Sequence, residues 1–244
     1  MAYKPILFNT EMVQAIQAGR KTQTRRLVKE IPLHAPYFEL CDGTTYACDM
    51  YGEWHPAERF CRIQPGDILW VREKWQHVYN FDDGDQLIEG TGRYVYYADN
   101  PMPFDYWVDP DTGEHKEQMP WKPSIHMPKE AARLFLRVKD VRVERLQSIT
   151  DADAHSEGVP EIGDYPIKPV YCPRCKGEGL IGGHIGHGYV EVDCPDCRTN
   201  VQRFSHLWDS TIKPADLDKY GWAADPWVWV VEFERCDRPE GWCS

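Results

Sequence analysis

The sequence predicts an α+β fold in which a small β-barrel carries peripheral helices and an inserted zinc-binding segment. Short apolar or alternating segments, which are typical of strands, recur along the 244 residues, whereas amphipathic helical stretches are few. Two Cys-x-x-Cys pairs interrupt the second half of the chain. Hydrophobic residues make up 42% of the sequence, which excludes a largely disordered chain.

The first predicted elements are a strand and a helix. Ile6-Leu7-Phe8 is an apolar run typical of a short strand, and Thr10 is the expected N-cap of the helix that follows. One face of that helix carries three apolar residues, Met12, Val13 and Ile16. Gly19 is expected just beyond the last turn, so the basic segment 20–26 leaves the end of a helix.

Strands dominate the middle of the chain. Pro65-Gly66-Asp67 predicts a turn, and the apolar run over 68–71 predicts a buried strand after it. Residues 94–97 predict another strand. The strongest strand pattern is the alternation over 134–143, which we expect to contain a bulge or turn near Asp140.

Two more helices and a strand complete the predicted order. Thr150 is expected to cap a short helix over 151–157, which Gly158 ends. A later helical stripe consists of Val201, Phe204, Leu207 and Trp208. Pro226 then opens a strand over 227–233. Three segments are interpreted as insertions or loop-rich extensions, at about 34–60, 77–120 and 160–198.

Four cysteines have the spacing of a closed structural zinc site. Cys172-Pro-Arg-Cys175 and Cys194-Pro-Asp-Cys197 are separated by 18 residues, within the range of zinc ribbons. Two residues between paired thiolates let both sulfurs reach one tetrahedral ion from a tight turn. The glycines of Cys175-Lys-Gly-Glu-Gly179, which resembles one CxxCxGxG repeat of J-domain chaperones, let the chain fold back over the metal. We therefore expect these thiolates to bind structural zinc in a knuckle over 171–198.

Two other metal arrangements are compatible with the sequence. His184 and His187 could each replace a cysteine, although four thiolates already complete a tetrahedron. His155-Ser156-Glu157 followed by Cys172-x-x-Cys175 is similar to the pattern of zinc nucleoside deaminases, whose metal keeps an open position for water. An odd count of nine cysteines argues against a disulfide framework. The cysteines without paired spacing are interpreted as buried or surface thiols and not as metal ligands: Cys41, Cys48, Cys61, Cys236 and Cys243.

The charge of the chain is unevenly distributed. A net charge of −11 argues against a general nucleic-acid coat, because non-specific binding requires phosphates to be neutralised. Residues 1–30, however, carry six basic and two acidic groups, a local charge of +4 that leaves −15 for the remainder. This basic region fits a small anionic ligand or one strand of RNA, and the plainer alternative is a solvated basic turn.

No segment of the sequence is typical of a secretory signal or a membrane span. The apolar run 5–8 is soon interrupted by polar residues, and the apolar run 227–231 is far too short to cross a bilayer. We therefore expect a cytosolic protein without a membrane partner.

Three motifs follow one another along the chain: Gly19-Arg-Lys-Thr-Gln-Thr-Arg-Arg26, Pro65-Gly-Asp-Ile-Leu-Trp-Val71 and the segment 150–157. Together they resemble the ASCH family, a branch of the PUA-like β-barrels. Further blocks are similar to long bacteriophage and prophage members of that family, at 121–128, 141–146 and 226–230. The resemblance implies one PUA-like domain over 1–244 with the insertions named above, in the cytoplasm of a bacterial or phage-infected cell.

One branch of the family hydrolyses N4-acetylcytidine to cytidine and acetate, using a Lys and a Thr of the GRKTxT segment and a later Glu. The resemblance therefore implies Thr24 as nucleophile, Lys21 as base and Glu157 as acid. In a straight strand Lys21 and Thr24 would point to opposite faces, so this chemistry requires a turn or bulge at residues 22–23. Lys21 would also need a pKa lowered by burial or by nearby arginines.

Two alternatives use the same region differently. PUA-like barrels commonly hold RNA or a modified base between basic and aromatic groups. The basic candidates here are Arg20, Arg25 and Arg26, and the aromatic candidates are Trp70, Trp75, Tyr94 and Trp121. Each Trp would otherwise serve as ordinary core. The other alternative is RNA cleavage with Lys21 or an arginine stabilising the phosphorane, although the sequence shows no His pair or second metal motif that would mark it.

Overall fold

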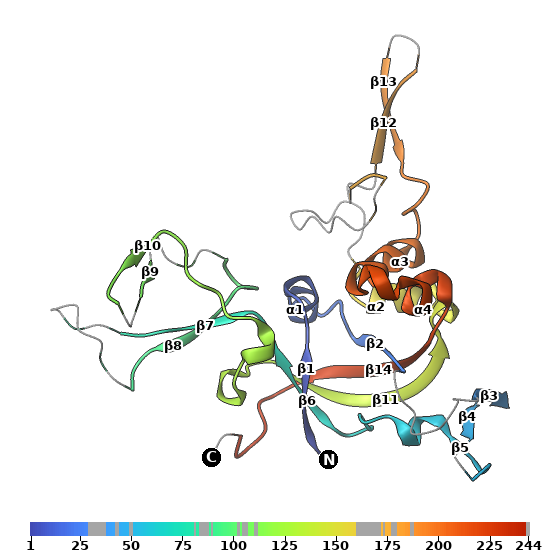
Figure 1. Ribbon diagram of the computed structural model, residues 1–244, viewed down its shortest axis with the longest axis horizontal. Coiled ribbons are helices and arrows are strands. Elements are labelled where there is room, and N and C mark those ends of the chain that lie inside the picture. The colour runs from blue at the N-terminus through green and yellow to red at the C-terminus, as the bar shows by residue number, and fades with distance from the viewer. Residues whose placement is uncertain are drawn as a thin grey trace. The chain divides into compact units, whose positions relative to one another are not determined.

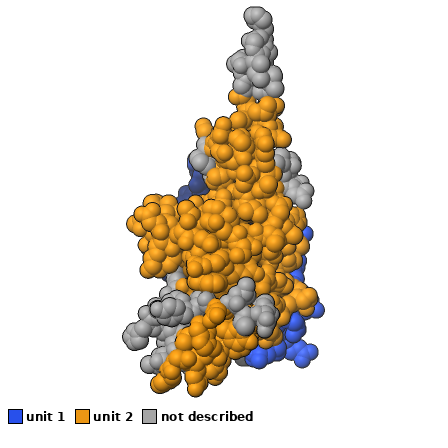
Figure 2. All heavy atoms as spheres, turned by 90° about the vertical axis from the view of Figure 1, so that its right-hand side faces the viewer, with its two compact units in different colours: residues 1–18, 67–137, 235–244 blue, residues 19–66, 138–234 orange. Residues whose placement is uncertain are grey.

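The computed structural model describes residues 1–28, 38–41, 44–48, 51–80, 82, 88, 90–101, 103, 107–109, 112–159, 172, 174–176, 180–185 and 188–242. At 38, 40, 41, 183–185 and 188–190 this description covers the backbone alone. The chain divides into two compact units, which are coloured separately in Figure 2. Unit 1 contains residues 1–18, 67–137 and 235–244, and unit 2 contains residues 19–66 and 138–234.

The largest element is a five-stranded mixed sheet with the strand order β1-β6-β11-β14-β2 (Figure 1). Its strands are β1 (Tyr3–Leu7), β6 (Ile68–Arg72), β11 (Phe135–Arg145), β14 (Trp227–Cys236) and β2 (Gln23–Leu27). β1 runs parallel to β6, whereas β6 pairs with β11, and β14 with β2, in antiparallel fashion. In the described strands, β1 and β2 therefore lie at the two edges of the sheet. No pairing between described strands closes this sheet into a barrel.

Unit 1 packs an aromatic core. Its helix α1 (Thr10–Gln17) is followed by two hairpins, made of β7 (Trp75–Val78) with β8 (Arg93–Tyr96) and of β9 (Trp107–Val108) with β10 (His115–Lys116). Two 3₁₀ turns complete the unit, η2 (Ser124–His126) and η3 (Lys129–Ala131). A buried cluster forms its core: Ile68, Trp75, Met127, Ala131, Ala132, Phe135 and Trp242.

Unit 2 combines helices with two further small sheets. Its helices are α2 (Asp151–Ser156), α3 (Asn200–Thr211) and α4 (Leu217–Tyr220). One small sheet consists of β3 (Phe38–Cys41), β4 (Thr44–Cys48) and β5 (Trp54–Pro56), and the other is the hairpin of β12 (Leu180–Ile185) and β13 (Gly188–Asp193). The 3₁₀ turns are η1 (Ala57–Phe60), η4 (Leu146–Ser148), η5 (Pro214–Asp216) and η6 (Trp222–Ala224).

Most predicted elements are present where the sequence indicates them. The structure has strands at each predicted position, and α2 has the expected Thr150 cap, reinforced by a capping box with Asp153. Gly19 and Gly158 follow their helices with φ of 74° and 87°, a conformation that favours glycine. The predicted cap of α1 is wrong by one residue, because the Asn9 side chain accepts the Met12 N–H (2.9 Å).

Strand β11 supports the predicted irregularity near Asp140. Leu136 and Val138 are buried, Lys139 and Asp140 are both exposed, and burial resumes at Val141. The alternation therefore changes phase at this point, as one extra residue in a strand produces.

The three predicted insertions each contain strands outside the five-stranded sheet. The range 34–60 includes β3, β4 and β5, the range 77–120 includes β8, β9 and β10, and the range 160–198 includes β12 and β13. Residues 160–171 lie outside the described part of the chain. No helix among the described residues has the length and apolar character needed to cross a bilayer.

Candidate functional site

Strand β2 presents alternate side chains to the two faces of the sheet. It pairs with β14 in one unbroken antiparallel register over residues 23–27. The hydrogen bond from Phe233 N to Thr22 O (2.8 Å) continues this register by one residue. Because side chains of a regular strand alternate, Arg25 and Thr24 leave β2 on opposite faces.

The face of β2 that carries Arg25 is joined to helix α2. Gln23 Nε2 donates to the main-chain oxygen of Asp153 (2.7 Å) and to its Oδ1 (3.2 Å). Thr22 N donates to Ser156 O (2.9 Å). The end of α2 is therefore fixed beside β2, and the residue that ends the helix is Glu157.

Lys21 and Glu157 form a buried ion pair. Lys21 Nζ lies 2.9 Å from Glu157 Oε2 and also donates to the main-chain oxygen of Glu157 (2.7 Å). The two side chains are 0% and 3% exposed, although 136 residues separate them in sequence. The hydrogen bond from Lys21 Nζ to the Glu157 carbonyl satisfies an acceptor at the C-terminal end of α2, where a positive charge is favoured.

Arg25 binds the other oxygen of the same carboxylate. Its NH1 lies 3.0 Å from Glu157 Oε1, and its NH2 lies 3.3 Å from Glu144 Oε2 on β11. Arg142 then links Glu144 to Glu232 through ion pairs. The site is therefore an alternating network of cations and carboxylates, which keeps each buried charge paired.

Burial sets the electrostatics of Lys21. Loss of solvent lowers the pKa of Lys21 below its ordinary value of 10.5, and the neighbouring Glu157 carboxylate partly opposes this shift. The positive charges of Arg26 and Arg25 lower the pKa of Lys21 further. Lys21 thus loses its proton more readily than an exposed lysine, as a buried general base requires.

Thr24 is buried at 2% exposure, on strand β2. It lies opposite Val231 in the sheet register, on the face away from Arg25. No hydrogen bond among the described residues joins Thr24 Oγ1 to Lys21 or Glu157. The predicted chemistry requires a turn or bulge at residues 22–23. Both residues instead continue the regular antiparallel pairing of β2 with β14.

The predicted binding residues occupy different environments. Arg25 is committed to carboxylates, and Arg20 NH1 approaches Gly158 O (3.5 Å). Arg26 is half-buried, and burial lowers its pKa. In unit 1, Trp75 is 6% exposed within the core and Trp70 packs against that core.

The four predicted metal ligands converge on one point. The sulfurs of Cys172, Cys175, Cys194 and Cys197 all lie within 4.8 Å of one another. Sγ–Sγ distances are 3.8 Å for Cys172–Cys194 and 3.4 Å for Cys175–Cys197. A tetrahedral zinc site with Zn–S bonds of about 2.3 Å has S–S edges of about 3.8 Å, so this buried cluster can hold a metal ion of that size.

The chemistry of the thiols also fits a cation. Burial raises the pKa of Cys194 and of Cys197. The thiols of Cys175 and Cys194 raise the pKa of Cys197 further, whereas a hydrogen bond from the Asp196 backbone partly opposes the rise at Cys194. A divalent cation would supply the charge that stabilises these two groups as thiolates.

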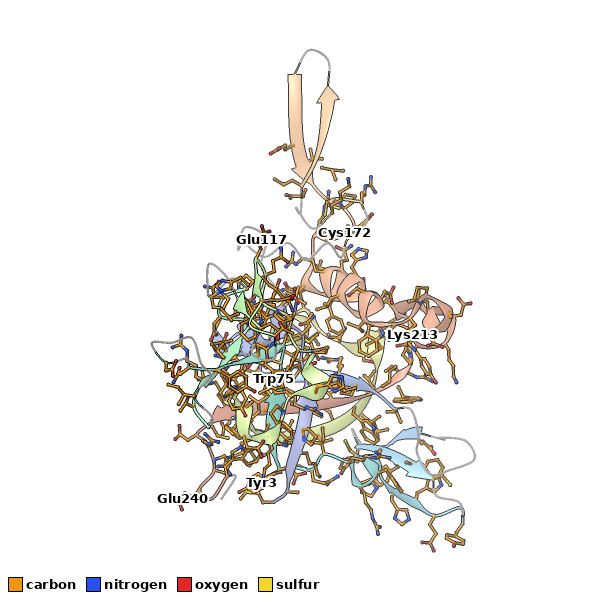
Figure 3. All side chains as sticks on the ribbon, turned by 60° about the vertical axis from the view of Figure 1, so that its left-hand side comes forward. Tyr3, Trp75, Glu117, Cys172, Lys213 and Glu240 are labelled. Atoms are coloured by element: carbon orange, nitrogen blue, oxygen red, sulfur yellow. The ribbon has the colours of Figure 1, made fainter. Side chains whose placement is uncertain are left out.

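The second Cys pair is fixed to helix α3. The side chains of Gln202, Arg203 and His206 contact the main-chain oxygens of Pro195 (3.1 Å), Cys197 (3.1 Å) and Asp196 (3.0 Å). Figure 3 labels Cys172 at the base of the β12–β13 hairpin.

Helix α3 in turn contacts the helix that ends at Glu157. Asn200 Nδ2 and Val201 N donate to the Asp151 carboxylate of α2 (2.8 and 3.3 Å). The guanidinium carbon of Arg25 lies 5.9 Å from the ring centroid of Phe204 on α3. The cysteine cluster and the ion pair are thus linked through one pair of helices.

The deaminase arrangement is not seen in the described residues. His155 is not part of the metal-binding group, and Glu157 is bound by Lys21 and Arg25. The side chains of His184 and His187 lie outside the described residues, as do those of Cys41 and Cys243. Cys48, Cys61 and Cys236 lie outside the cluster.

Sequence reasoning missed several members of the ion-pair network: Gln23, Arg142, Glu144, Asp153 and Glu232. One signal for them is polar residues at alternate positions of strands, as in Lys21, Gln23 and Arg25.

Comparison with protein-family models, curated protein sequences and solved structures finds no match for this chain.

Metal content tests the cysteine cluster. We expect about one metal ion per chain in protein purified without chelators, because four converging thiolates form a complete site. Elemental mass spectrometry measures it, and the Cys175→Ser/Cys197→Ser variant should lose the metal. Cys48→Ser is the control and should retain it. Metal-free wild-type protein with four reactive thiols would contradict the assignment.

Unfolding in urea tests the buried ion pair. Glu157→Gln leaves Lys21 and Arg25 without their shared negative charge, so we expect a loss of about 3–5 kcal/mol in the free energy of unfolding. The control Glu234→Gln, at an exposed ion pair with Lys139, should change it by less than about 0.5 kcal/mol. The double variant Lys21→Met/Glu157→Gln should be more stable than Glu157→Gln alone. Equal stability of wild type and Glu157→Gln would show that the pair is not buried as described.

Proposed function

We propose that this protein is a hydrolase of an acylated cytidine of the N4-acetylcytidine type, with Lys21 and Glu157 as its acid–base pair. The observation that carries the proposal is the 2.9 Å contact between these two buried side chains. They are two of the three residues that the ASCH resemblance selects from the sequence alone. We also propose that the chain is a long member of that family with a PUA-like barrel.

The ion pair can provide both a base and an acid. If the shared proton moves from Lys21 Nζ to Glu157 Oε2, the result is a free amine beside a carboxylic acid. Burial and the positive charges of Arg26 and Arg25 favour the free amine of Lys21, whereas the Glu157 carboxylate opposes loss of the lysine proton. The balance between these opposing effects on Lys21 would set the pH at which the pair is active.

The proposed reaction begins with two proton transfers. A hydroxyl group attacks the acetyl carbonyl carbon, and its proton passes to Lys21 Nζ. The C–N bond then breaks, and Glu157 gives its proton to the departing N4 of cytidine. Water then attacks the resulting ester and gives one proton to Glu157. The ester C–O bond breaks, Lys21 returns its proton to the hydroxyl group, and acetic acid leaves, so the pair regains its initial protonation state.

Thr24 is assigned as the nucleophile on the family resemblance alone. The regular register of β2 directs its side chain away from Arg25, so geometry supports Lys21 and Glu157 more directly than it supports Thr24. Both members of the ion pair are also closed to solvent. The proposal therefore includes a local movement of the end of α2 that admits the substrate.

We propose zinc as the metal of the cysteine cluster. Four thiolates in a closed tetrahedron suit zinc in a structural role, and no open coordination position remains for a reacting water. In the metal measurement above, an equivalent amount of iron would contradict this choice.

Incubation with N4-acetylcytidine, followed by chromatographic separation of the nucleosides, tests the proposed activity. We expect cytidine and acetate from the wild-type protein and a loss of at least about 100-fold in Lys21→Met, the size of a general-base contribution. Lys139→Ala, at an exposed lysine of β11, is the control and should retain activity. Thr24→Ala should be inactive and Thr24→Ser active if the Thr24 hydroxyl attacks.

Each other outcome has a distinct meaning. Full activity in Thr24→Ala would replace Thr24 by water as the attacking group. Uridine formed from cytidine, and abolished by chelation, would favour a deaminase. No product at high concentrations of folded protein would overturn the hydrolase proposal.

A further inference from the structure

The β7–β8 hairpin and the segment beside it are locally basic and aromatic. Residues 74–79, 92–97 and 121–123 contain three basic residues, six aromatic residues and no Asp or Glu, in a chain of net charge −11. These segments pair directly: β7 with β8, and Trp75 with Lys122 through an antiparallel bridge. All of them belong to unit 1.

The register divides the side chains into two faces. Trp75, Tyr94 and Tyr96 share one face and pack in or against the unit 1 core. The hydrogen bond from Tyr97 N to Lys74 O (3.0 Å) continues the β7–β8 register by one residue. The alternation therefore puts four residues on the face opposite the core, which we call the cationic face: Lys74, Arg93, Tyr97 and Trp121.

Contacts hold the aromatic residues of the cationic face in place. Lys74 Nζ lies 3.8 Å from the ring centroid of Tyr97, and the rings of Tyr97 and Trp121 meet edge to face at 5.3 Å. Trp121 Nε1 donates to Pro101 O (3.1 Å). Both rings remain half-exposed and Arg93 is exposed, so this face combines positioned rings with accessible positive charge.

The carboxylates nearest to Lys74 along these strands are already neutralised. Glu73 precedes Lys74 in sequence, and both of its carboxylate oxygens lie 2.9 Å from Arg133. Asp99, which follows Tyr97 by two residues, binds NH1 of the same Arg133 (2.6 Å). Lys74 is thus available to an external anion without competition from these two groups.

We propose that the cationic face binds a single-stranded nucleic acid. Phosphates would contact Lys74 and Arg93, and unpaired bases would stack on Trp121 and Tyr97. An acidic peptide offers the charge but no ring to stack, and a duplex keeps its base faces covered. The surface lies on unit 1, and its argument does not depend on the Lys21–Glu157 chemistry of unit 2.

Fluorescence anisotropy with labelled 12-nucleotide RNA and DNA of one sequence, over a range of salt, tests the proposal. Lys74→Ala/Arg93→Ala should weaken binding and reduce the slope of log K against log salt by about 1.4, which corresponds to two phosphate contacts on a single strand. Trp121→Ala should weaken binding about 5- to 150-fold without changing the slope, because stacking releases no counterions. The RNA and DNA arms show which strand is preferred.

The matched control is Lys139→Ala/Lys213→Ala, which removes the same charge from exposed positions of unit 2. It should bind like the wild type. Lys74→Ala also removes the contact between Lys74 and the Tyr97 ring. Arg93→Glu, at an exposed position, is therefore tested separately as a variant that leaves this contact in place. The proposal is overturned if the wild type fails to bind at about 100 µM in low salt. Equal weakening by the control, or equal displacement of RNA by polyglutamate and by unlabelled RNA, would also overturn it.

Discussion

The buried contact between Lys21 and Glu157 is the interaction on which the candidate site depends. A lysine charge removed from water is costly unless a partner and hydrogen bonds replace the solvent, and here a carboxylate and a carbonyl do so. That requirement holds the start of β2 against the end of α2, 136 residues away in sequence. Arg25 and Glu144 extend the same constraint to β11.

The cysteine cluster contacts the same pair of helices. The Cys194–Cys197 turn receives side chains from the first turns of α3, and the N-terminus of α3 binds Asp151 at the start of α2. A metal ion at the four sulfurs would therefore stabilise the α2–α3 pair that positions Glu157. A structural metal would in this way help to position Glu157, although the proposed chemistry itself involves no metal.

Local signals in the sequence predicted much of the fold, because caps, turns and metal ligands depend on nearby residues. The structure confirms Thr150 as the N-cap of α2 and Gly158 as the glycine that follows this helix. It also brings the four cysteines together. Long-range pairing was harder to predict. The face on which Thr24 lies depends on the β14 register, and the pairing of Arg25 with Glu144 and Glu157 depends on strand order. Neither the strand order of the five-stranded sheet nor this network follows from local pattern.

The ionisation of Lys21 distinguishes a poised base from a purely structural ion pair. Nitrogen-detected NMR of ¹⁵N-lysine-labelled protein, with the signal assigned by Lys21→Met, follows the Nζ group as pH is raised. Because burial outweighs the effect of Glu157, we expect a pKa for Lys21 below its ordinary value of 10.5. A pKa at or above 10.5 would show that the Glu157 charge dominates, and would contradict the assignment of Lys21 as a base.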